Sequence, residues 1–391
     1  MPLGLRLITF PRPLAVAASR LGAYAIGVMP RARSGNPTIA DVARACGVGT
    51  MTVSRVVNGG SLVSPETAAR VRAAIKRLGY EPNEAARVLK SQASHTIGLI
   101  VPDLADPFFS ACATAVQHLA TENGYMTLLL AAERDRESET RELALMRSRN
   151  IAGILIVPSD EGCIEPLKKL QAHGIPIVML DRTFAGVDAG EVMVENQDGA
   201  KKAVRHLIDH GHRNILCVGY DRQFNSIAER ITGYESALAE AGLKPQYAIV
   251  EHAAEVGPTV VKRLRGVRPP TALFTLNNVS STQVLSVLQR EQIHVPDEVA
   301  LIGFDDFDLA PLLSVPLTAI RQPASELGRS ATRLLFEFIR QKQTDTRPVL
   351  SRIVLPTELV IRRSCGCAPI PKVELEGGKK HSEGDRVTVP A

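Results

Sequence analysis

Short apolar runs alternate with helix-length amphipathic segments over most of the chain, from Thr96 onward. Runs this short and this apolar, separated by segments long enough for a helix, indicate buried parallel strands in βαβ units. They are too many for one compact sheet, and a polar stretch at Val194-Glu195-Asn196 divides them. The pattern therefore predicts an α/β body of two doubly wound parallel-sheet subdomains. The runs read TIGLIVPD, YMTLLLAA, AGILIVPS, IPIVMLD, NILCVGY, TALFTLNN, VALIGFDD and LTAIRQP.

A helical pattern precedes these runs. Between Thr38 and Asn58, apolar residues recur at helical spacing on both sides of Gly47-Val48-Gly49, which predicts a helix, a tight turn and a second helix. Thr38 is suited to cap the first helix, with Asp41 as the acid of a capping box. Val48 is available as a buried plug between the two helices.

The outer face of the predicted second helix carries polar and basic side chains, and a short helix of this kind suits the major groove of DNA. An ordinary corner of two helices at the edge of a globular domain is the alternative on these residues alone. The segments after this motif favour DNA binding. The outer residues are Thr50, Met51, Ser54 and Arg55.

Two further helical segments come before the body. Ser64 can cap a third helix. Pro82 then opens a segment, PNEAARVLK, that is too short to form a stable helix by itself in water. Within it Leu89 stands between Arg87 and Lys90, and an exposed leucine between cations suits a wedge that enters the minor groove. The alternative is a plain linker in which Leu89 has no special role.

Charge is distributed unevenly along the 391 residues, whose net charge is +5. Residues 1–35 hold five arginines and no acid, and residues 36–91 hold eight basic against four acidic side chains, so the rest carries a net −4. A basic head on a mildly acidic body indicates a polyanionic partner for the head alone. With 45% hydrophobic residues and no apolar run near the ~20 residues of a membrane helix, the chain is expected to be soluble and globular.

Residues 1–35 have no clear fold, and Arg20 interrupts their apolar stretch, which disfavours a signal peptide. We expect either a disordered extension or a start codon assigned too early, with Met29 as the true start. The six cysteines are scattered and mostly lie in apolar stretches. That usage is typical of reduced, buried thiols in a cytoplasmic protein rather than of disulfides.

Polar and aromatic side chains gather where the apolar runs end, and Arg230 lies in a loop-to-helix segment, AERITGY. In doubly wound sheets ligands bind beyond the carboxyl ends of the strands. Aromatics beside carboxylates, amides and arginine suit a small polyhydroxylated or heterocyclic ligand. Singly, each residue could equally cap a helix or fill the core; as a set at matching ends of two subdomains, they predict a cleft. The strand-end residues are Asp103, Asp106, Phe108, Phe109, Ser159, Asp181, Arg182, Asn277, Asn278, Asp305 and Asp306.

The sequence offers little for metal binding or catalysis. His206, His210 and His212 are spaced closely enough to share a metal ion, but no carboxylate or cysteine near them in the sequence completes a tetrahedral set. Cys365 and Cys367 are by themselves too few for a zinc site. There is no Gly-x-Ser-x-Gly elbow and no phosphate loop. We therefore expect no metal, no cofactor and no enzyme.

Seven segments in this order resemble the lactose/galactose repressor (LacI/GalR) family of bacterial transcription factors, over about Thr38 to Cys367. That resemblance implies a small all-α helix-turn-helix head plus hinge helix, then a body like the type I periplasmic binding proteins. The segments are TIADVARACGVGTMTVSRVVN, LGYEPNEAARVLK, IGLIVPDLADPFF, ERITGY, VPDEVALIGFDD, LTAIRQP and LVIRRSCG.

The resemblance also implies roles for individual residues. Members bind a palindromic DNA operator as homodimers, their two hinge helices fold together in the widened minor groove, and a small effector lies between the subdomains. The base-reading positions are Thr50, Met51 and Arg55; those expected at the DNA backbone or in the minor groove are Thr38, Ser54, Arg87, Leu89 and Lys90. The effector-binding positions are Asp103, Phe108, Phe109, Ser159, Arg182, Arg230, Asn278 and Asp305.

Three departures from the family pattern bear on these roles. Gly49 stands where serine usually caps the recognition helix, a change that weakens a cap by a few tenths of a kcal/mol. Asn278 stands where aspartate is usual, and Glu195 replaces the usual aspartate before Asn196. These two changes put the hydrogen-bonding pattern of the effector pocket in question.

The sequence thus predicts a cytoplasmic, dimeric DNA-binding repressor controlled by a small effector, with a sugar or sugar derivative favoured over a purine. An exported sugar-binding protein and an enzyme are the competing classes; the basic head disfavours the first, and the lack of a catalytic constellation the second. No membrane association is expected. The predicted domains are an extension, 1–35; the head, 36–81; a hinge helix and linker, 82–94; an N-terminal subdomain, 95–195 plus 321–350; a C-terminal subdomain, 196–320 plus 351–364; and a disordered tail, 365–391.

Overall fold

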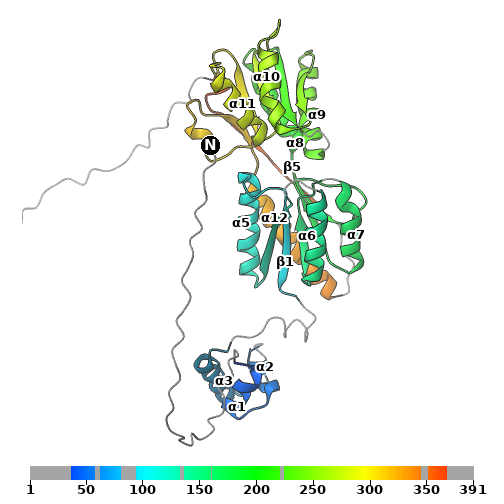
Figure 1. Cartoon of the computed structure of the whole chain (residues 1–391), viewed down its shortest axis with the longest axis vertical. Coiled ribbons are helices and arrows are strands. Elements are labelled where there is room, and N and C mark those ends of the chain that lie inside the picture. The colour runs from blue at the N-terminus through cyan, green and yellow to red at the C-terminus, as the bar shows by residue number, and fades with distance from the viewer. Residues whose placement is uncertain are drawn as a thin grey trace, which may run out of the picture. The chain divides into compact units, whose positions relative to one another are not determined.

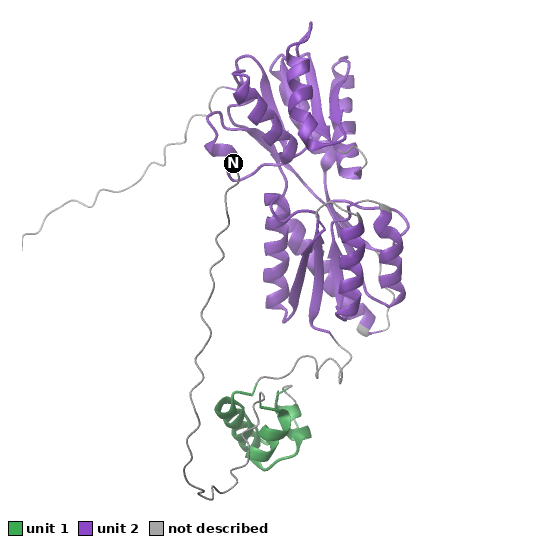
Figure 2. Cartoon of the chain, viewed as in Figure 1, with its two compact units in different colours: residues 1–92 green, residues 93–391 purple. Residues whose placement is uncertain are grey.

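The computed structural model describes residues 37–57, 62–80, 94–132, 136–159, 161–220, 224–344 and 351–367. Contacts divide the chain into two compact units, Met1–Gln92 and Ala93–Ala391 (Figure 2). The predicted extension and nearly all of the predicted hinge lie outside the described residues, as do Arg87, Leu89 and Lys90. No helix of the described part is both long and apolar enough to cross a membrane.

The first unit is a three-helix head. The carboxylate of Asp41 accepts hydrogen bonds from the Thr38 backbone N–H (2.9 Å) and hydroxyl (2.6 Å), which fixes the start of the first helix. Gly47 ends it at φ 64°, in the left-handed region that glycine adopts without strain. Val48 packs against the core of the head, as its position between the helices predicts. The helices are α1 Ile39–Cys46, α2 Thr50–Val57 and α3 Pro65–Leu78, and the buried core is Val42, Ala43, Cys46, Val53, Val56, Val71 and Ala74.

The second unit contains the two predicted doubly wound subdomains (Figure 1). The first sheet has the order β11-β5-β4-β3-β1-β2 with every pair parallel. One apolar core lies between this sheet and α5 with α12, and another lies on the side of α6 and α7. The strands are β1 Thr96–Val101, β2 Met126–Ala131, β3 Gly153–Ile156, β4 Ile177–Leu180, β5 Gly190–Val194 and β11 Arg352–Leu355; the helices are α5 Pro107–Glu122, α6 Arg136–Ser148, α7 Ile164–Ala172 and α12 Ala324–Gln343.

The second sheet repeats this arrangement in the order β12-β10-β9-β8-β6-β7. Its pairs are parallel except β12, which runs antiparallel to β10. Two apolar cores again cover the two faces. The strands are β6 Ile215–Tyr220, β7 Gln246–Val250, β8 Ala272–Thr275, β9 Ala300–Phe304, β10 Thr318–Arg321 and β12 Glu358–Val360; the helices are α8 Asn196–Asp209, α9 Asn225–Glu240, α10 Val256–Leu264 and α11 Asn278–Arg290.

The chain passes between the two sheets three times: from β5 to α8, from β10 to α12, and from β11 to β12. The third passage corrects a predicted boundary. The sequence predicts that residues 351–364 belong to the C-terminal subdomain, but β11 pairs with β5 in the first sheet, so only the residues after Leu355 can join the second. The short apolar pattern of this strand does not reveal which edge it pairs with, because both sheets offer a similar edge.

The start of the predicted tail also needs correction. Residues 365–367 are described, and Cys365 is 1% exposed. Ser364 holds this segment in place because its hydroxyl donates to Leu301 O of β9 (2.6 Å) and accepts from Thr318 N of β10 (2.8 Å). Residues 368–391 lie outside the described part.

Candidate functional site

The head presents the outer face that the sequence predicts for α2. Thr50, Met51 and Arg55 are exposed, and the Met51 side chain is 59% accessible although it is apolar. Val53 and Val56, on the other face of the same helix, are buried in the core. The helix therefore offers two polar side chains and a methionine to a partner while its valines hold it in place. Ser54 is half-buried, and Thr38 is exposed at the start of α1.

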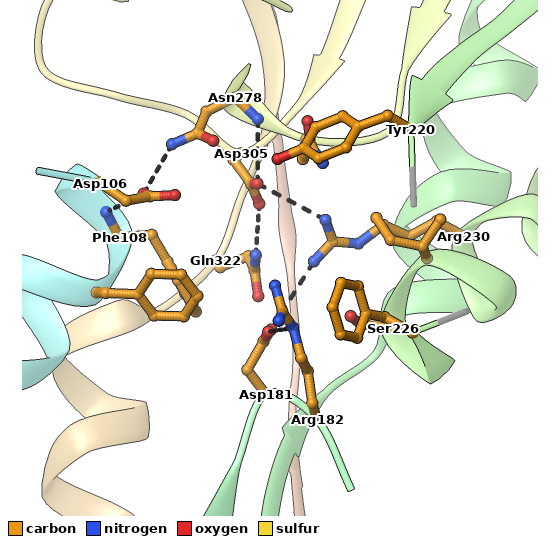
Figure 3. A pocket seen from close by; sticks show the side chains of 14 residues that line it. Asp106, Phe108, Asp181, Arg182, Tyr220, Ser226, Arg230, Asn278, Asp305 and Gln322 are labelled. Carbon is orange, nitrogen blue, oxygen red and sulfur yellow. Dashed lines mark hydrogen bonds and ion pairs between the residues drawn. The ribbon is translucent and has the colours of Figure 1, made fainter. Parts of the chain in front are cut away.

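A cleft lies between the two subdomains (Figure 3), and residues from the strand ends and following helices of both sheets line it. Its free volume is about 30 Å³, room for only one or two water molecules. The lobes therefore leave little free space at this point, and a larger ligand requires side chains or lobes to move apart. The lining residues are Asp106, Phe108, Phe109, Asp181, Arg182, Tyr220, Phe224, Ser226, Ile227, Arg230, Asn277, Asn278, Asp305 and Gln322.

Arg230 of α9 is the central cation of the cleft and is 3% exposed. Its guanidinium donates to Asn196 Oδ1 (2.8 Å) and to Leu276 O (2.7 Å). It lies 3.6 Å from the carboxylate of Asp305 and 3.8 Å from the ring centroid of Phe304. A buried guanidinium that is paired and hydrogen-bonded in this way is fixed in one geometry.

Two aspartates occupy equivalent places in the two sheets. Asp181 follows β4 and Asp305 follows β9, each the third strand in the order of its sheet. Both adopt positive φ, 61° and 76°, a conformation that aspartate tolerates better than most side chains. Burial raises the pKa of Asp181, and the charges of Arg182 and Arg230 only partly offset that effect.

A chain of hydrogen bonds crosses the cleft from one lobe to the other. Gln322 donates to the Asp305 carboxylate, which also accepts from the backbone N–H of Asn278 (3.3 Å). The Asn278 side chain then donates to Asp106 Oδ1 (2.8 Å) in the N-terminal lobe. Asp106 is the N-cap of α5 and also accepts from Phe108 N (3.0 Å). The Asn278–Asp106 bond therefore ties α11 directly to α5.

A second link between the lobes involves aromatic contacts. The Arg182 guanidinium, at the end of β4, lies 3.7 Å from the ring centroid of Phe224, just before α9. Nearby, Asn225 Nδ2 donates to Thr183 Oγ1 (3.2 Å). A cation over an aromatic face is favourable, most of all when both groups are removed from water. The two lobes are thus linked by contacts at two places in the cleft.

Six of the eight predicted effector-binding residues line the cleft: Phe108, Phe109, Arg182, Arg230, Asn278 and Asp305. Asp103 and Ser159 do not. The Asp103 carboxylate accepts from Ala105 N (2.8 Å) and so closes its own turn. The backbone N–H of Ser159 donates to Glu139 Oε2 in a buried contact beside α6. The structure therefore supports a local structural role for Asp103 and Ser159, and not a place in the cleft.

Eight lining residues are absent from the predicted effector-binding set. Three of them stand at strand ends that the sequence pattern marks, so the same pattern could have predicted a role in the cleft. They are Asp106, Asp181 and Asn277. Gln322 follows β10 in the run LTAIRQP, a comparable signal. Tyr220 ends β6 in the run NILCVGY, which is again a comparable signal. No comparable pattern marks the other three, because they come from the position just before α9 and from its first turn. They are Phe224, Ser226 and Ile227.

Although no cysteine lies near the histidines in the sequence, the fold brings two cysteines to them. Cys365 and Cys367 lie beside His206 and His210 at the end of α8. About 160 residues separate the two pairs in the chain, so sequence spacing could not reveal the contact. None of the six cysteines forms a disulfide, and five are buried.

A helix-turn-helix head followed by a two-lobed body with a polar cleft is typical of one class of protein, the DNA-binding regulators that also bind a small ligand. The sequence profile of the bacterial regulatory proteins of the lacI family matches residues 38–83, and that of the periplasmic binding protein-like domain matches residues 204–365. The chain is 30% identical over 332 residues to the HTH-type transcriptional regulator DegA of Bacillus subtilis (strain 168), covering 84% of this chain and 97% of that protein. The HTH-type transcriptional repressor PurR of Vibrio parahaemolyticus serotype O3:K6 is 33% identical over 84% of this chain and 98% of its own length.

Solved structures agree. The complex of the transcriptional regulator CelR with cellobiose aligns with a TM-score of 0.61 at 29% identity, over 84% of this chain and 99% of that one. The lac repressor dimer bound to operator and the anti-inducer ONPF has the same fold, with a TM-score of 0.75 at 24% identity over 85% and 99% of the two chains. The chain therefore belongs to the LacI family of bacterial regulatory proteins. It is a DNA-binding transcriptional regulator, as the seven segments of its sequence predict.

Proposed function

We propose that this protein is a dimeric repressor that binds a palindromic operator. Its affinity for the operator falls or rises when a sugar-like effector binds in the cleft. The observation that carries the proposal is the hydrogen-bond chain that joins the two lobes through Asn278 and Asp106. An effector that enters the cleft must replace these bonds. Effector binding and lobe geometry are therefore coupled.

The chemistry of the cleft supports a polyhydroxylated effector. Carboxylates of Asp181 and Asp305 and the amide of Gln322 provide acceptors, while Arg230 and Asn278 provide donors. Asp181 Oδ1 and Gln322 Oε1 are buried without a hydrogen-bond partner among the described residues. Sugar hydroxyls both donate and accept, so they can satisfy both groups. The CelR structure, which contains cellobiose, is a relative with a sugar ligand.

A purine-like effector is the second candidate because of the aromatic side of the cleft. Phe108 and Phe109 are in edge contact, with ring centroids 5.2 Å apart, and both line the cleft. The ring of Phe108 is only half-buried, so it could stack on a heterocycle. Polar residues nevertheless outnumber aromatic ones around the cleft, which favours the sugar.

On the DNA side, we propose that Arg55 reads a guanine, with Thr50 and Met51 beside it on the exposed face of α2. Arginine has the donor fork that guanine accepts in the major groove. Thr38, at the start of α1, and Ser54 would contact the DNA backbone. Arg87, Leu89 and Lys90 would enter the minor groove in a hinge helix that forms when two chains meet an operator, as the family resemblance implies. Coupling between effector and operator is reciprocal, so each ligand changes the affinity of the other by the same factor.

The experiment uses the full chain and a palindromic site selected from random duplexes. Calorimetry with mono- and disaccharides and with purine bases identifies the effector, and operator affinity is then measured with and without it. We expect a sugar to bind and to shift operator affinity at least about fivefold, the lower range of allosteric coupling. Binding of purine bases alone would select the second candidate. A chain that binds effector without any change in operator affinity would contradict the coupling.

A matched pair of variants locates the effector. Asp305→Asn removes the charge at the centre of the cleft, whereas Asp297→Asn removes an exposed charge of the same lobe that lines neither this cleft nor the cavity beside it. We expect the first variant to lose effector binding while still binding the operator, and the second to behave as the unchanged protein. Normal effector affinity in Asp305→Asn would show that the cleft is not the effector site.

A further inference from the structure

Two histidines and two cysteines meet on the C-terminal subdomain, away from the cleft. His206 Nε2 lies 3.4 Å from Cys365 Sγ and 3.1 Å from Cys367 Sγ, and the two sulfurs are 3.2 Å apart. His210 Nε2 lies 3.0 Å from Cys367 Sγ. We propose that these four side chains bind a Zn²⁺ ion in a Cys₂His₂ site.

The separations are close to those of a tetrahedral zinc site. With Zn–N bonds of about 2.0–2.1 Å and Zn–S bonds of about 2.3 Å, neighbouring ligand atoms lie ~3.3–3.8 Å apart. The donor atoms of His206, Cys365 and Cys367 all lie within 4.8 Å of one another. Small outward shifts of these three ligands make room for the ion, and a small movement of the His210 side chain, whose Nε2 lies outside this group of three but 3.0 Å from Cys367 Sγ, brings in the fourth ligand. Imidazole and thiolate donors select zinc over magnesium or calcium, which prefer oxygen.

The end of α8 orients the two imidazoles. His206 is in the last turn and His210 follows as the C-cap, four residues on, so both side chains lie on one face of the helix. Their ring centroids are 4.3 Å apart. His210 Nδ1 lies 2.7 Å from His206 O and must carry its proton there, because a carbonyl oxygen only accepts. The Nε2 lone pair is then free for a metal, as in metal-ligating histidines generally.

The Cys-Gly-Cys turn orients the two sulfurs. Gly366 has φ 82°, a left-handed conformation that turns the chain so that both cysteines reach the same point. Ser364, hydrogen-bonded to β9 and β10, anchors the turn to the sheet. The turn is thus built on rigid elements, which favours metal binding because little order is lost when the ion enters.

A further hydrogen bond supports the buried sulfur. Thr318 Oγ1 accepts from the backbone N–H of Arg362 (2.8 Å) and lies 3.2 Å from Cys365 Sγ, to which it donates. A donor of this kind stabilises a metal-bound thiolate. Zinc binding displaces the two thiol protons to solvent, and the ion is held by four protein ligands with no open position. The site is therefore structural: it fastens the residues after β12 to α8.

The full chain, purified without a histidine tag under reducing conditions, tests the proposal. Elemental analysis is expected to find one zinc per chain. Replacement by Co²⁺ is expected to give the visible bands of a tetrahedral ion and a thiolate-to-cobalt charge-transfer band. Cys367→Ser and His206→Ala should each lose at least about tenfold in cobalt affinity, the scale on which even outer-shell partners act.

Two control variants have similar local structure without the cluster. His173 is the C-cap of α7 and places Nδ1 2.7 Å from Lys169 O, the same arrangement as His210 with no cysteine beside it. Cys112 is buried in the N-terminal lobe. His173→Ala and Cys112→Ala should keep the full cobalt spectrum, and circular dichroism of Cys367→Ser, an incompletely buried position, checks that the variant folds.

Three results would overturn the zinc site. The first is reduced, folded protein that takes up neither zinc nor cobalt. The second is an unchanged cobalt spectrum in Cys367→Ser and in His206→Ala. The third is an intact mass lower by two hydrogens, with Cys365 and Cys367 in one disulfide, in protein isolated under reducing conditions, because a disulfide leaves no thiolate to bind the ion.

Discussion

Arg230→Met tests how much the buried arginine of the cleft contributes to the stability of the folded body. Methionine keeps much of the length of the side chain and fills the space with an unbranched apolar group. The change removes the donors to Asn196 Oδ1 and Leu276 O and the cation 3.6 Å from Asp305. Breaking a buried ion pair by removing one partner costs about 3–5 kcal/mol. The acceptors left without a donor, Asn196 Oδ1 and Leu276 O, belong to the same network as the ion pair. Their costs are therefore not added separately, and we expect a total loss of unfolding free energy of about 3–5 kcal/mol.

Urea unfolding of the full chain measures this loss, followed by far-ultraviolet circular dichroism and tyrosine fluorescence, since the chain has no tryptophan. Arg265→Met is the control. Arg265 is paired with Glu291, but its side chain is 69% exposed against 3% for Arg230, and exposed ion pairs contribute about 0–1 kcal/mol. A loss in Arg230→Met no larger than that in Arg265→Met would refute the view that desolvated charges control the stability of the cleft.

The structure predicts the outcome of three further substitutions. Asp181→Asn should stabilise the folded body at pH 7. Burial raises the pKa of Asp181 in the folded state, so the protonated carboxyl contributes to stability below its ordinary pKa of 3.8. That contribution is lost as the pH rises through the pKa of the folded state. The difference between the two proteins in urea unfolding should shrink toward low pH, and a constant difference would contradict this account. Gly49→Ser should raise the stability of the head by a few tenths to about 1 kcal/mol, because serine supplies a helix cap and reduces the conformational freedom of the unfolded chain. Amide hydrogen exchange measures the change. A Cβ at Gly49 meets nothing within 4 Å, so destabilisation would show that the backbone at this position differs from the one described. Arg55→Ala should cost about 1–3 kcal/mol on the selected operator and relax specificity at one base pair; an equal loss on random DNA would assign Arg55 to the phosphates.

The elements of this protein arise from local rules that are visible in its sequence. The apolar runs became strands, and all but one are buried, because a short apolar segment between helices hides both faces inside a parallel sheet. The exception is YMTLLLAA, which forms the half-buried edge strand β2 with Met126 exposed. Thr38 with Asp41, and Gly47 after them, fixed the ends of α1 through contacts within a few residues. Val48 packs against the core of the head but is only half-buried, so it is a less complete plug than its position between the helices predicts. The marked strand ends likewise predicted a cleft, since parallel strands bring their carboxyl ends to one edge of each sheet.

Tertiary structure decided which of these marked residues face one another. Asp103 and Ser159 stand at strand ends like Asp181, yet a local turn and a buried contact with Glu139 occupy them instead. Their roles depend on where the backbone leaves the strand, and one residue of difference reverses the direction of a side chain.

The sequence alone determined eight of the twelve described strands, the two-lobed body and the class of the protein, because helix periodicity, strand periodicity and capping act over short distances along the chain. The strands β5, β7, β11 and β12 were not among the predicted runs. Only the fold brought Asn278 to Asp106, across 172 residues, and Cys367 to His210, across 157. Contacts of that range arise from packing two sheets through three chain passages, and no local pattern encodes their partners. For the same reason β11 joined the first sheet and Cys365 became part of the core.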